Sequence, residues 1–134
     1  MKRVLTVGVF DLMHFGHMML FKRAKEYGDE LIVAVQDSAF INKFKPNSKV
    51  VYTTDQRLIM VHSIKYVDKV VVYDTVDQLI QNVEFDVFVK GPDQKHAGFE
   101  FAVQWCLDHD KEVIELPRTE GISSSMIRSL LSGD

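Results

Sequence analysis

The amino-acid sequence predicts an α/β fold in which an open five-stranded parallel sheet carries helices on both faces. Five short runs of β-branched and other apolar residues recur along the chain, and segments with helical spacing lie between them. Continuous apolar runs suit strands that are covered on both faces. Strands that alternate with helices imply right-handed crossovers and a parallel sheet. The predicted strands span residues 3–10, 30–35, 69–73, 85–90 and 112–116.

The first helix is predicted from the periodicity of residues 15–27. One face of this segment carries Leu20, Phe21 and Ala24 together with His17, whereas the other face is charged. A Gly-Asp pair follows directly and is typical of a helix that ends there.

Four further helices are predicted after the second strand. Two of them open with a capping-box pattern, in which a threonine is followed three residues later by a glutamine: Thr53 with Gln56, and Thr75 with Gln78. The last helix has Ser123 or Ser124 as its N-cap. The four segments span residues 53–65, 75–82, 97–108 and 123–131.

The longest irregular stretch is residues 37–52, a mixture of lysines with proline, asparagine and serine. Connections of this length within a small domain are more often functional than idle. The 134 residues match the commonest domain size, and no repeat or linker divides them. We therefore expect a single Rossmann-like domain over residues 1–134.

Composition and charge exclude several classes of function. A formal net charge of -3 gives no overall basic field to hold nucleic acid, so a phosphate-containing partner should be small. Cys106 is the only cysteine, which rules out an internal disulfide. No run approaches 18 uninterrupted apolar residues, and no signal peptide is apparent. We expect a cytoplasmic protein without membrane spans.

The decapeptide GVFDLMHFGH, residues 8–17, lies where the first predicted strand ends and the first crossover starts. Ligands of open parallel sheets bind beyond the carboxyl ends of the strands. Gly8 and Gly16 permit close backbone approach, and a helix N-terminus offers N–H groups to an anion. His14 and His17 add imidazole donors, which carry a charge if protonated. This combination suits nucleotidyl or phosphoryl transfer.

Other interpretations of the two histidines stay open at this point. His17 shares its helix face with apolar residues and could be a core histidine whose ring is satisfied by a carbonyl. A zinc site would need a third ligand, and the remaining histidines lie in other elements. Neither a GxGxxG fingerprint nor a P-loop is present.

A second segment, RTEGISSS at residues 118–125, has the chemistry of a phosphate site. Arg118 offers a bidentate donor and Gly121 permits backbone approach. The serines open a helix whose N–H groups can face an anion. An ordinary loop with an N-cap is the alternative.

The two motifs together resemble the signatures of a known enzyme family. His-x-Gly-His after the first strand resembles that of the nucleotidyltransferase superfamily, and RTEGISSSMIRSLL at 118–131 looks like the RTEGIS signature of the cytidylyltransferases. The similarity covers most of the chain. By size and pattern, the chain is most similar to the glycerol-3-phosphate cytidylyltransferase type.

The resemblance implies a role for several residues. His14 and His17 would bind the triphosphate and stabilise the transition state, with Lys45 and Arg118 as further catalytic groups. A loop lysine would bridge the substrate phosphate and the α-phosphate; Lys43 and Lys45 both qualify, and Lys45 is favoured. Arg57 would contact phosphates, and Asp11 would either contact substrate or cap the turn. The implied nucleotide-binding set is Gly8, Val9, Phe10, His14, His17, Asp93, Arg118, Thr119, Gly121, Ile122, Ser123 and Ser124.

The resulting hypothesis is transfer of CMP from CTP to a small phosphorylated alcohol, glycerol-3-phosphate or a similar compound, with Mg²⁺ entering with CTP. Residues 93–101 match the glycerol-3-phosphate pattern poorly, so another acceptor stays open. The alternatives are an adenylyltransferase that uses ATP and a non-catalytic nucleotide-binding module. KYVDKVV resembles a dimerisation stretch of the family, so we expect a homodimer through the region Lys65–Asp68.

Overall fold

The computed structural model describes residues 1–44, 50–119 and 124–132, and within these it contains five strands and six helices. No helix in the described ranges has the length and apolar character needed to cross a bilayer. In chain order the elements are β1 (Arg3–Gly8), α1 (Phe15–Lys25), β2 (Glu30–Gln36), α2 (Ser38–Phe44), α3 (Thr54–His62), β3 (Lys69–Tyr73), α4 (Val76–Asn82), β4 (Val87–Lys90), α5 (Ala97–Asp108), β5 (Glu112–Glu115) and α6 (Ser124–Ser132).

The strand β1 lies at the centre of an all-parallel sheet with the order β3-β2-β1-β4-β5. It pairs with β2 from Arg3 to Gly8 and with β4 from Val4 to Thr6. The chain first extends the sheet from β1 to β3 and then returns to add β4 and β5 on the other side. The predicted five-stranded parallel α/β fold is thus confirmed, and its point of reversal lies beside β1, where such sheets bind ligands.

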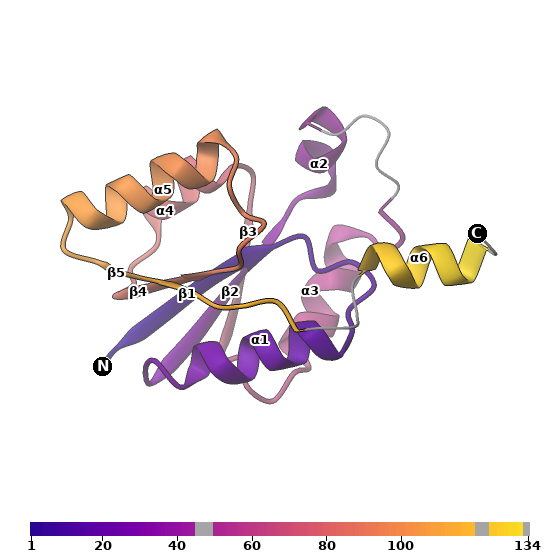
Figure 1. Ribbon diagram of the computed structural model, residues 1–134, viewed down its shortest axis with the longest axis horizontal. Helices are drawn as coiled ribbons and strands as arrows, with labels where there is room; N and C mark the ends of the chain where they lie inside the picture. The colour runs from indigo at the N-terminus through magenta and orange to yellow at the C-terminus, as the bar shows by residue number, and fades with distance from the viewer. Residues whose placement is uncertain (45–49, 120–123, 133–134) are drawn as a thin grey trace.

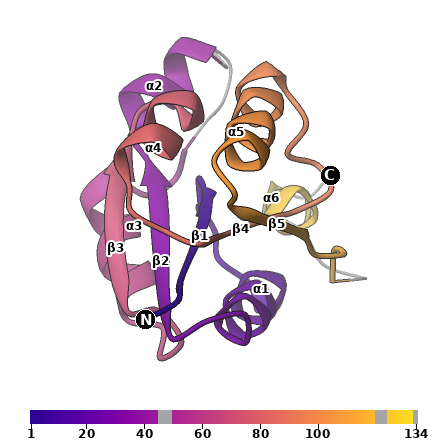
Figure 2. The ribbon, with the colours of Figure 1, turned by 90° about the vertical axis from the view of Figure 1, so that its left-hand side faces the viewer.

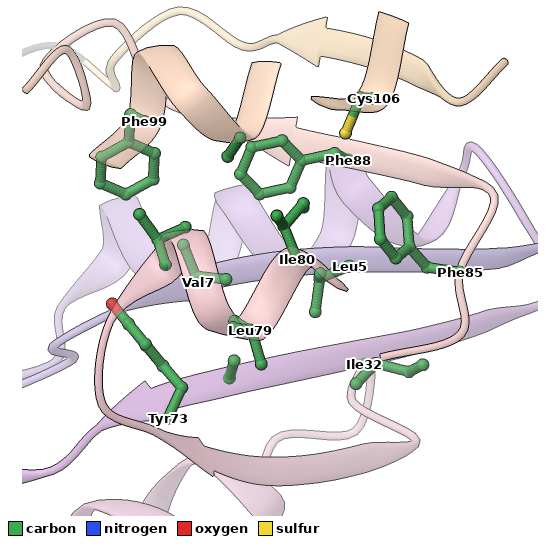
Figure 3. Packing of buried hydrophobic residues seen from close by; sticks show 13 residues of the cluster. Leu5, Val7, Ile32, Tyr73, Leu79, Ile80, Phe85, Phe88, Phe99 and Cys106 are labelled. Carbon is green, nitrogen blue, oxygen red and sulfur yellow. The ribbon is translucent and has the colours of Figure 1, made fainter. Parts of the chain in front are cut away.

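Helices cover both faces of the sheet (Figures 1 and 2), α4 and α5 on one and α1 and α3 on the other. Successive strand residues point to opposite faces, so neighbours on one strand enter different cores. Leu5 and Val7 pack with α4 and α5, as Figure 3 shows, whereas Val4 packs with Phe21 of α1 and Val61 of α3. Burial on both faces explains why the strands appear as continuous apolar runs.

The helix α2 lies inside the stretch that was expected to be irregular, so that expectation was wrong for residues 38–44. The Asp37 carboxylate accepts a hydrogen bond from the backbone N–H of Ala39 at 2.9 Å, as a capping side chain does. Ile41 is buried and anchors the helix. Seven residues are too short a window for helical periodicity to be recognised in the sequence.

The two predicted capping boxes have different outcomes. Thr53 Oγ1 accepts from the N–H of Gln56 at 3.1 Å, and Gln56 Oε1 accepts from the N–H of Thr53 at 3.0 Å, so the first box is confirmed. Thr75 is the N-cap of α4 but makes no side-chain capping bond, so the second is wrong. Its hydroxyl is buried and has no hydrogen-bond partner among the described residues.

This difference predicts opposite effects of replacing the two threonines with valine, which has nearly the same shape. Thr53→Val should lower the free energy of unfolding by about 1 kcal/mol, because a working cap is lost. Thr75→Val should leave it unchanged or raise it by up to about 1 kcal/mol, because a buried, unsatisfied hydroxyl is removed. Urea denaturation measures both values. Equal losses in the two variants would show that Thr75 does cap its helix.

Candidate functional site

The loop between β1 and α1 holds two non-glycine residues in the left-handed region, Phe10 at φ 56° and Leu12 at φ 46°. Side chains seldom adopt this conformation, and it concentrates at functional sites. The Phe10 ring folds back over Gly8, where a Cβ atom would lie 2.8 Å from the ring. Gly8 is therefore needed for an internal contact, in addition to the predicted approach of a ligand to residues 8–10.

His14 and His17 cap the N-terminus of α1 reciprocally. His14 Nδ1 accepts from the N–H of Gly16 at 3.0 Å, and His17 Nδ1 accepts from the N–H of His14 at 3.1 Å. The two histidines thus form a capping box in which imidazoles replace the usual hydroxyl and amide. A Cβ on Gly16 would lie 2.7 Å from the His14 ring, so only glycine permits this geometry.

These contacts define the chemical state of both rings. Because each Nδ1 accepts a hydrogen bond, the proton of the neutral imidazole lies on Nε2. Burial, followed by the neighbouring His14, lowers the pKa of His17 to about 4, and burial also lowers the pKa of His14. At pH 7 the ligand-free site therefore presents two neutral Nε2–H donors, without the positive charge that protonation would add.

The core interpretation of His17 is partly correct. Its half-buried ring meets the Phe10 ring edge-on, with ring centroids 5.6 Å apart. The centroid of the same ring lies 4.0 Å from that of the His14 ring. Its partner, however, is a backbone N–H and not a carbonyl. Within the described ranges, neither Nε2 has a hydrogen-bond partner, so both donors are available to a ligand.

The first two residues of the second motif, Arg118 and Thr119, are described, and Thr119 lies beside the first motif. A Cβ on Gly16 would be 3.7 Å from Cβ of Thr119, which brings the segment after β5 to the start of α1. Arg118 forms an ion pair with Asp93, in the turn after β4, and both side chains are mostly exposed. Asp93, Arg118 and Thr119, which all belong to the predicted nucleotide-binding set, thus lie near the carboxyl edge of the sheet and come from two separate segments of the chain.

Arg57 has a different place from the one predicted. Its side chain is fully buried, and its five N–H groups donate to five oxygen atoms of the protein at 2.7–3.3 Å. In this conformation no N–H group is left for a substrate phosphate. Contrary to the prediction, Arg57 links separate segments of the protein through these hydrogen bonds. Its acceptors are the carbonyls of Val9, Gln36 and Tyr52 and the hydroxyls of Ser38 and Thr54.

Asp11 is also held inside the protein. Its buried carboxylate accepts from the backbone N–H groups of Val51 at 2.7 Å and Tyr52 at 3.0 Å. These contacts join Asp11 to a distant segment of the chain, so they are neither the substrate contact nor the cap on its own turn that the sequence suggested. The bonds fasten the chain that enters α3 to the loop that carries the histidines.

Several predicted residues lie outside the part of the chain that is described. These are Lys45, Gly121, Ile122 and Ser123. Lys43 lies in α2 and Ser124 begins α6, but the positions of their side chains are likewise outside the description. Among the described residues, no group of three or more His, Cys, Asp or Glu side chains is placed to hold a metal ion.

Two residues of the site were not predicted from the sequence. Gln94 donates from Nε2 to the carbonyl of Val7 at 2.9 Å and thereby joins the turn after β4 to the end of β1. Lys90 is buried at the end of β4. A charged residue that closes an apolar strand was a usable signal for Lys90, whereas a glutamine in a polar loop offers none.

The pKa of His17 predicts how stability depends on pH. The folded protein keeps His17 neutral down to about pH 4, whereas the unfolded chain takes up a proton near 6.5. The unfolded state then binds more protons between these values, so stability is present above pH 6.5 and falls as the pH drops toward 4, by roughly 3 kcal/mol.

His17→Gln isolates this effect, because glutamine at the same position can still accept the capping bond and does not titrate. The free energies of unfolding of wild type and variant should be measured in urea from pH 4 to pH 8. The free energy of unfolding of wild type should exceed that of the variant by a smaller amount as the pH falls from 6.5 to 4. A constant difference between the two proteins would contradict the low pKa.

Known proteins are similar to this chain in sequence and in structure. The sequence profile described as cytidylyltransferase-like matches residues 5–130. The chain is 38% identical to the glycerol-3-phosphate cytidylyltransferase of Bacillus subtilis over 99% of both chains. It is 42% identical to that of Staphylococcus aureus over 99% of this chain and 97% of that protein.

A solved structure described as a lipopolysaccharide core biosynthesis protein from Thermoplasma volcanium has a TM-score of 0.69 and 26% identity, over 90% of this chain and 98% of that one. This likeness agrees with the single parallel sheet described above. The family profile includes most of β1, the histidine loop and residues 118–119, and the two relatives align over nearly their full lengths. The chain belongs to the cytidylyltransferase-like family and is a nucleotidyltransferase.

Proposed function

We propose that this protein is a cytoplasmic enzyme that transfers CMP from CTP to a small phosphorylated alcohol, with glycerol-3-phosphate as the first choice. The observation that carries the proposal is the pair of Nε2–H donors at the N-terminus of α1, beside Thr119. The two aligned glycerol-3-phosphate cytidylyltransferases support the choice of CTP and of acceptor. A lone, buried cysteine, Cys106, suits a reducing compartment.

The chemistry follows from the placement of donors. A phosphate oxygen of the acceptor attacks the α-phosphorus of CTP in line and forms a new P–O bond. The bond from the α-phosphorus to the bridging oxygen breaks, and its electron pair leaves with pyrophosphate. No side-chain nucleophile is needed. His14 and His17 are positioned by the backbone before the ligand arrives, so their Nε2–H groups can stabilise charge on phosphate oxygens without rearrangement.

The remaining negative charges of CTP and of the acceptor phosphate would be bound by cationic groups. We propose that Arg118 exchanges the Asp93 carboxylate for the triphosphate, since a guanidinium binds both anions through paired N–H groups. Lys45 is proposed to bridge the acceptor phosphate and the α-phosphate. Mg²⁺ would arrive as its complex with CTP, because proteins bind Mg²⁺ largely through substrate phosphates.

The proposal predicts pyrophosphate release that requires CTP, Mg²⁺ and glycerol-3-phosphate together. His14→Ala and His17→Ala should each lower kcat by about 100-fold or more, since preorganised donors to the reacting phosphate are lost. His62→Ala is the matched control, because His62 lies exposed at the end of α3, and it should keep wild-type rates. A coupled pyrophosphate assay measures all four proteins.

The same assay separates the alternatives. Faster release with ATP than with CTP would indicate an adenylyltransferase. Binding of CTP without release, across a panel of phosphorylated alcohols, would indicate a nucleotide-binding module. Wild-type rates in both histidine variants would refute the roles given to His14 and His17.

We also propose a homodimer that forms through the surface around Lys65–Asp68. Asp68 accepts from Lys25 Nζ and from the N–H of Leu31, so the segment is fixed within its own chain. Ile59 on α3 and Val72 on β3 add exposed apolar side chains to this side of the molecule, where α3 packs on β3. Association surfaces are typically contiguous apolar patches, and we propose that these two side chains form part of one.

Sedimentation equilibrium tests the dimer. The wild-type protein should sediment at about twice its chain mass of 15.4 kDa. Ile59→Asp should shift the protein toward 15.4 kDa, because a charge is placed in an apolar interface. A wild-type mass of one chain at micromolar concentration would contradict the proposal.

A further inference from the structure

Lys90 ends β4 with a buried ammonium group whose hydrogen bonds connect two separate segments. Only 9% of the residue is exposed. Its Nζ donates to Glu115 Oε1 at 2.8 Å, to the carbonyl of Gly91 at 3.3 Å and to the carbonyl of Gln94 at 3.4 Å. An ammonium has three N–H groups, so these three acceptors use its full capacity.

One of the connected segments is the turn of residues 91–94. Gln94 Oε1 accepts from the N–H of Gly91 at 3.0 Å, and the amide of the same side chain reaches the carbonyl of Val7. The carbonyls at both ends of the turn point to Lys90. The turn is therefore closed around a single cation, and Asp93 projects from it toward Arg118.

The other segment is the end of β5, from which the chain continues to Arg118. Glu115 pairs with Lys90 across the sheet, and the N–H of Leu116 donates to the carbonyl of Lys90 at 2.9 Å. The Lys90 ammonium also lowers the pKa of Glu115, which keeps its partner charged. Arg118 follows three residues after this anchor.

We propose that Lys90 is a positioning residue for nucleotide binding, which sets the places of Asp93 and Arg118 relative to each other. It contacts neither side chain directly. It holds the turn that carries Asp93 through two carbonyls and the strand end that leads to Arg118 through Glu115. The inference rests on the proposed function, in which Arg118 leaves the Asp93 carboxylate to bind the triphosphate of CTP.

A merely structural role would change stability without changing the kinetic constants of the folded enzyme. A positioning role predicts that KM for CTP changes much more than kcat. Lys90→Met keeps an unbranched side chain, one atom shorter than that of lysine, but removes the N–H donors. The KM for CTP should therefore rise roughly tenfold while kcat stays within about twofold. The effects of substitutions at Lys90 and Asp93 on KM for CTP should also not be additive. In a protein that already carries Asp93→Asn, Lys90→Met should raise KM for CTP less than it does in wild type.

Lys2→Met is a matched control. Lys2 pairs with Glu112, at the other end of β5, at 3.5 Å, and both side chains are about half exposed. The variant removes a lysine–glutamate pair of the same strand away from the site, so both kinetic constants should stay at wild-type values. Glu115→Gln is a second probe, because its side chain is half exposed and its replacement should leave the fold intact. It should raise KM for CTP by about threefold.

Steady-state pyrophosphate release, with isothermal titration of CTP, measures these effects. Higher KM and weaker CTP binding in Lys90→Met and Glu115→Gln, with Lys2→Met unchanged, would support the inference. If Lys90→Met does not fold, the result for Glu115→Gln decides. Normal wild-type turnover with unchanged KM in the Lys90 and Glu115 variants would overturn the inference alone. A wild-type protein that neither binds nor turns over CTP would overturn the proposed function and this inference with it.

Discussion

The buried guanidinium of Arg57 is the contact on which the carboxyl edge of the sheet depends. All five of its N–H groups donate to protein oxygens, including the carbonyls of Val9 after β1 and Gln36 at the end of β2. Burial of a charge is costly unless its hydrogen bonds are complete. Burial lowers the pKa of Arg57, and the nearby carboxylates of Asp11 and Asp37 oppose that shift. The guanidinium is therefore buried with its hydrogen bonds complete, and two nearby carboxylates favour its charged form.

The rest of the site is arranged around the end of β1, which this contact helps to fix. The carbonyl of Val9 is held by Arg57, and the carbonyl of Val7 is held by Gln94 from the other half of the sheet. Directly after Val9, Phe10 adopts its left-handed conformation and packs against His17. Backbone atoms on one strand end thus connect the histidine loop, α3 and the turn after β4. A site assembled from distant segments in this way keeps its geometry only when each connection is formed.

The sequence predicted the sheet well because its strands are covered on both faces, and burial of that kind leaves a strong apolar signal. It predicted α1 for the related reason that this helix has a buried apolar side, and α3 from the capping box at its start. It did not predict the direction in which Arg57 points, because sequence position does not tell whether a cation faces a ligand or five internal acceptors. The unused hydroxyl of Thr75 and the proton position on the histidines depend in the same way on tertiary contacts. Residues 45–49 and 120–123, where the remaining predicted groups lie, are outside the described structure.

The histidine capping box also has a consequence for the thermodynamics of ligand binding. Each Nδ1 accepts a hydrogen bond from a backbone N–H, so a proton added to that atom would break the cap that holds the ring. The neutral form of both imidazoles is therefore favoured by the same contacts that form the start of α1. A polyanion at the two Nε2–H groups meets dipoles that are already in place, and its binding does not require the site to take up a proton.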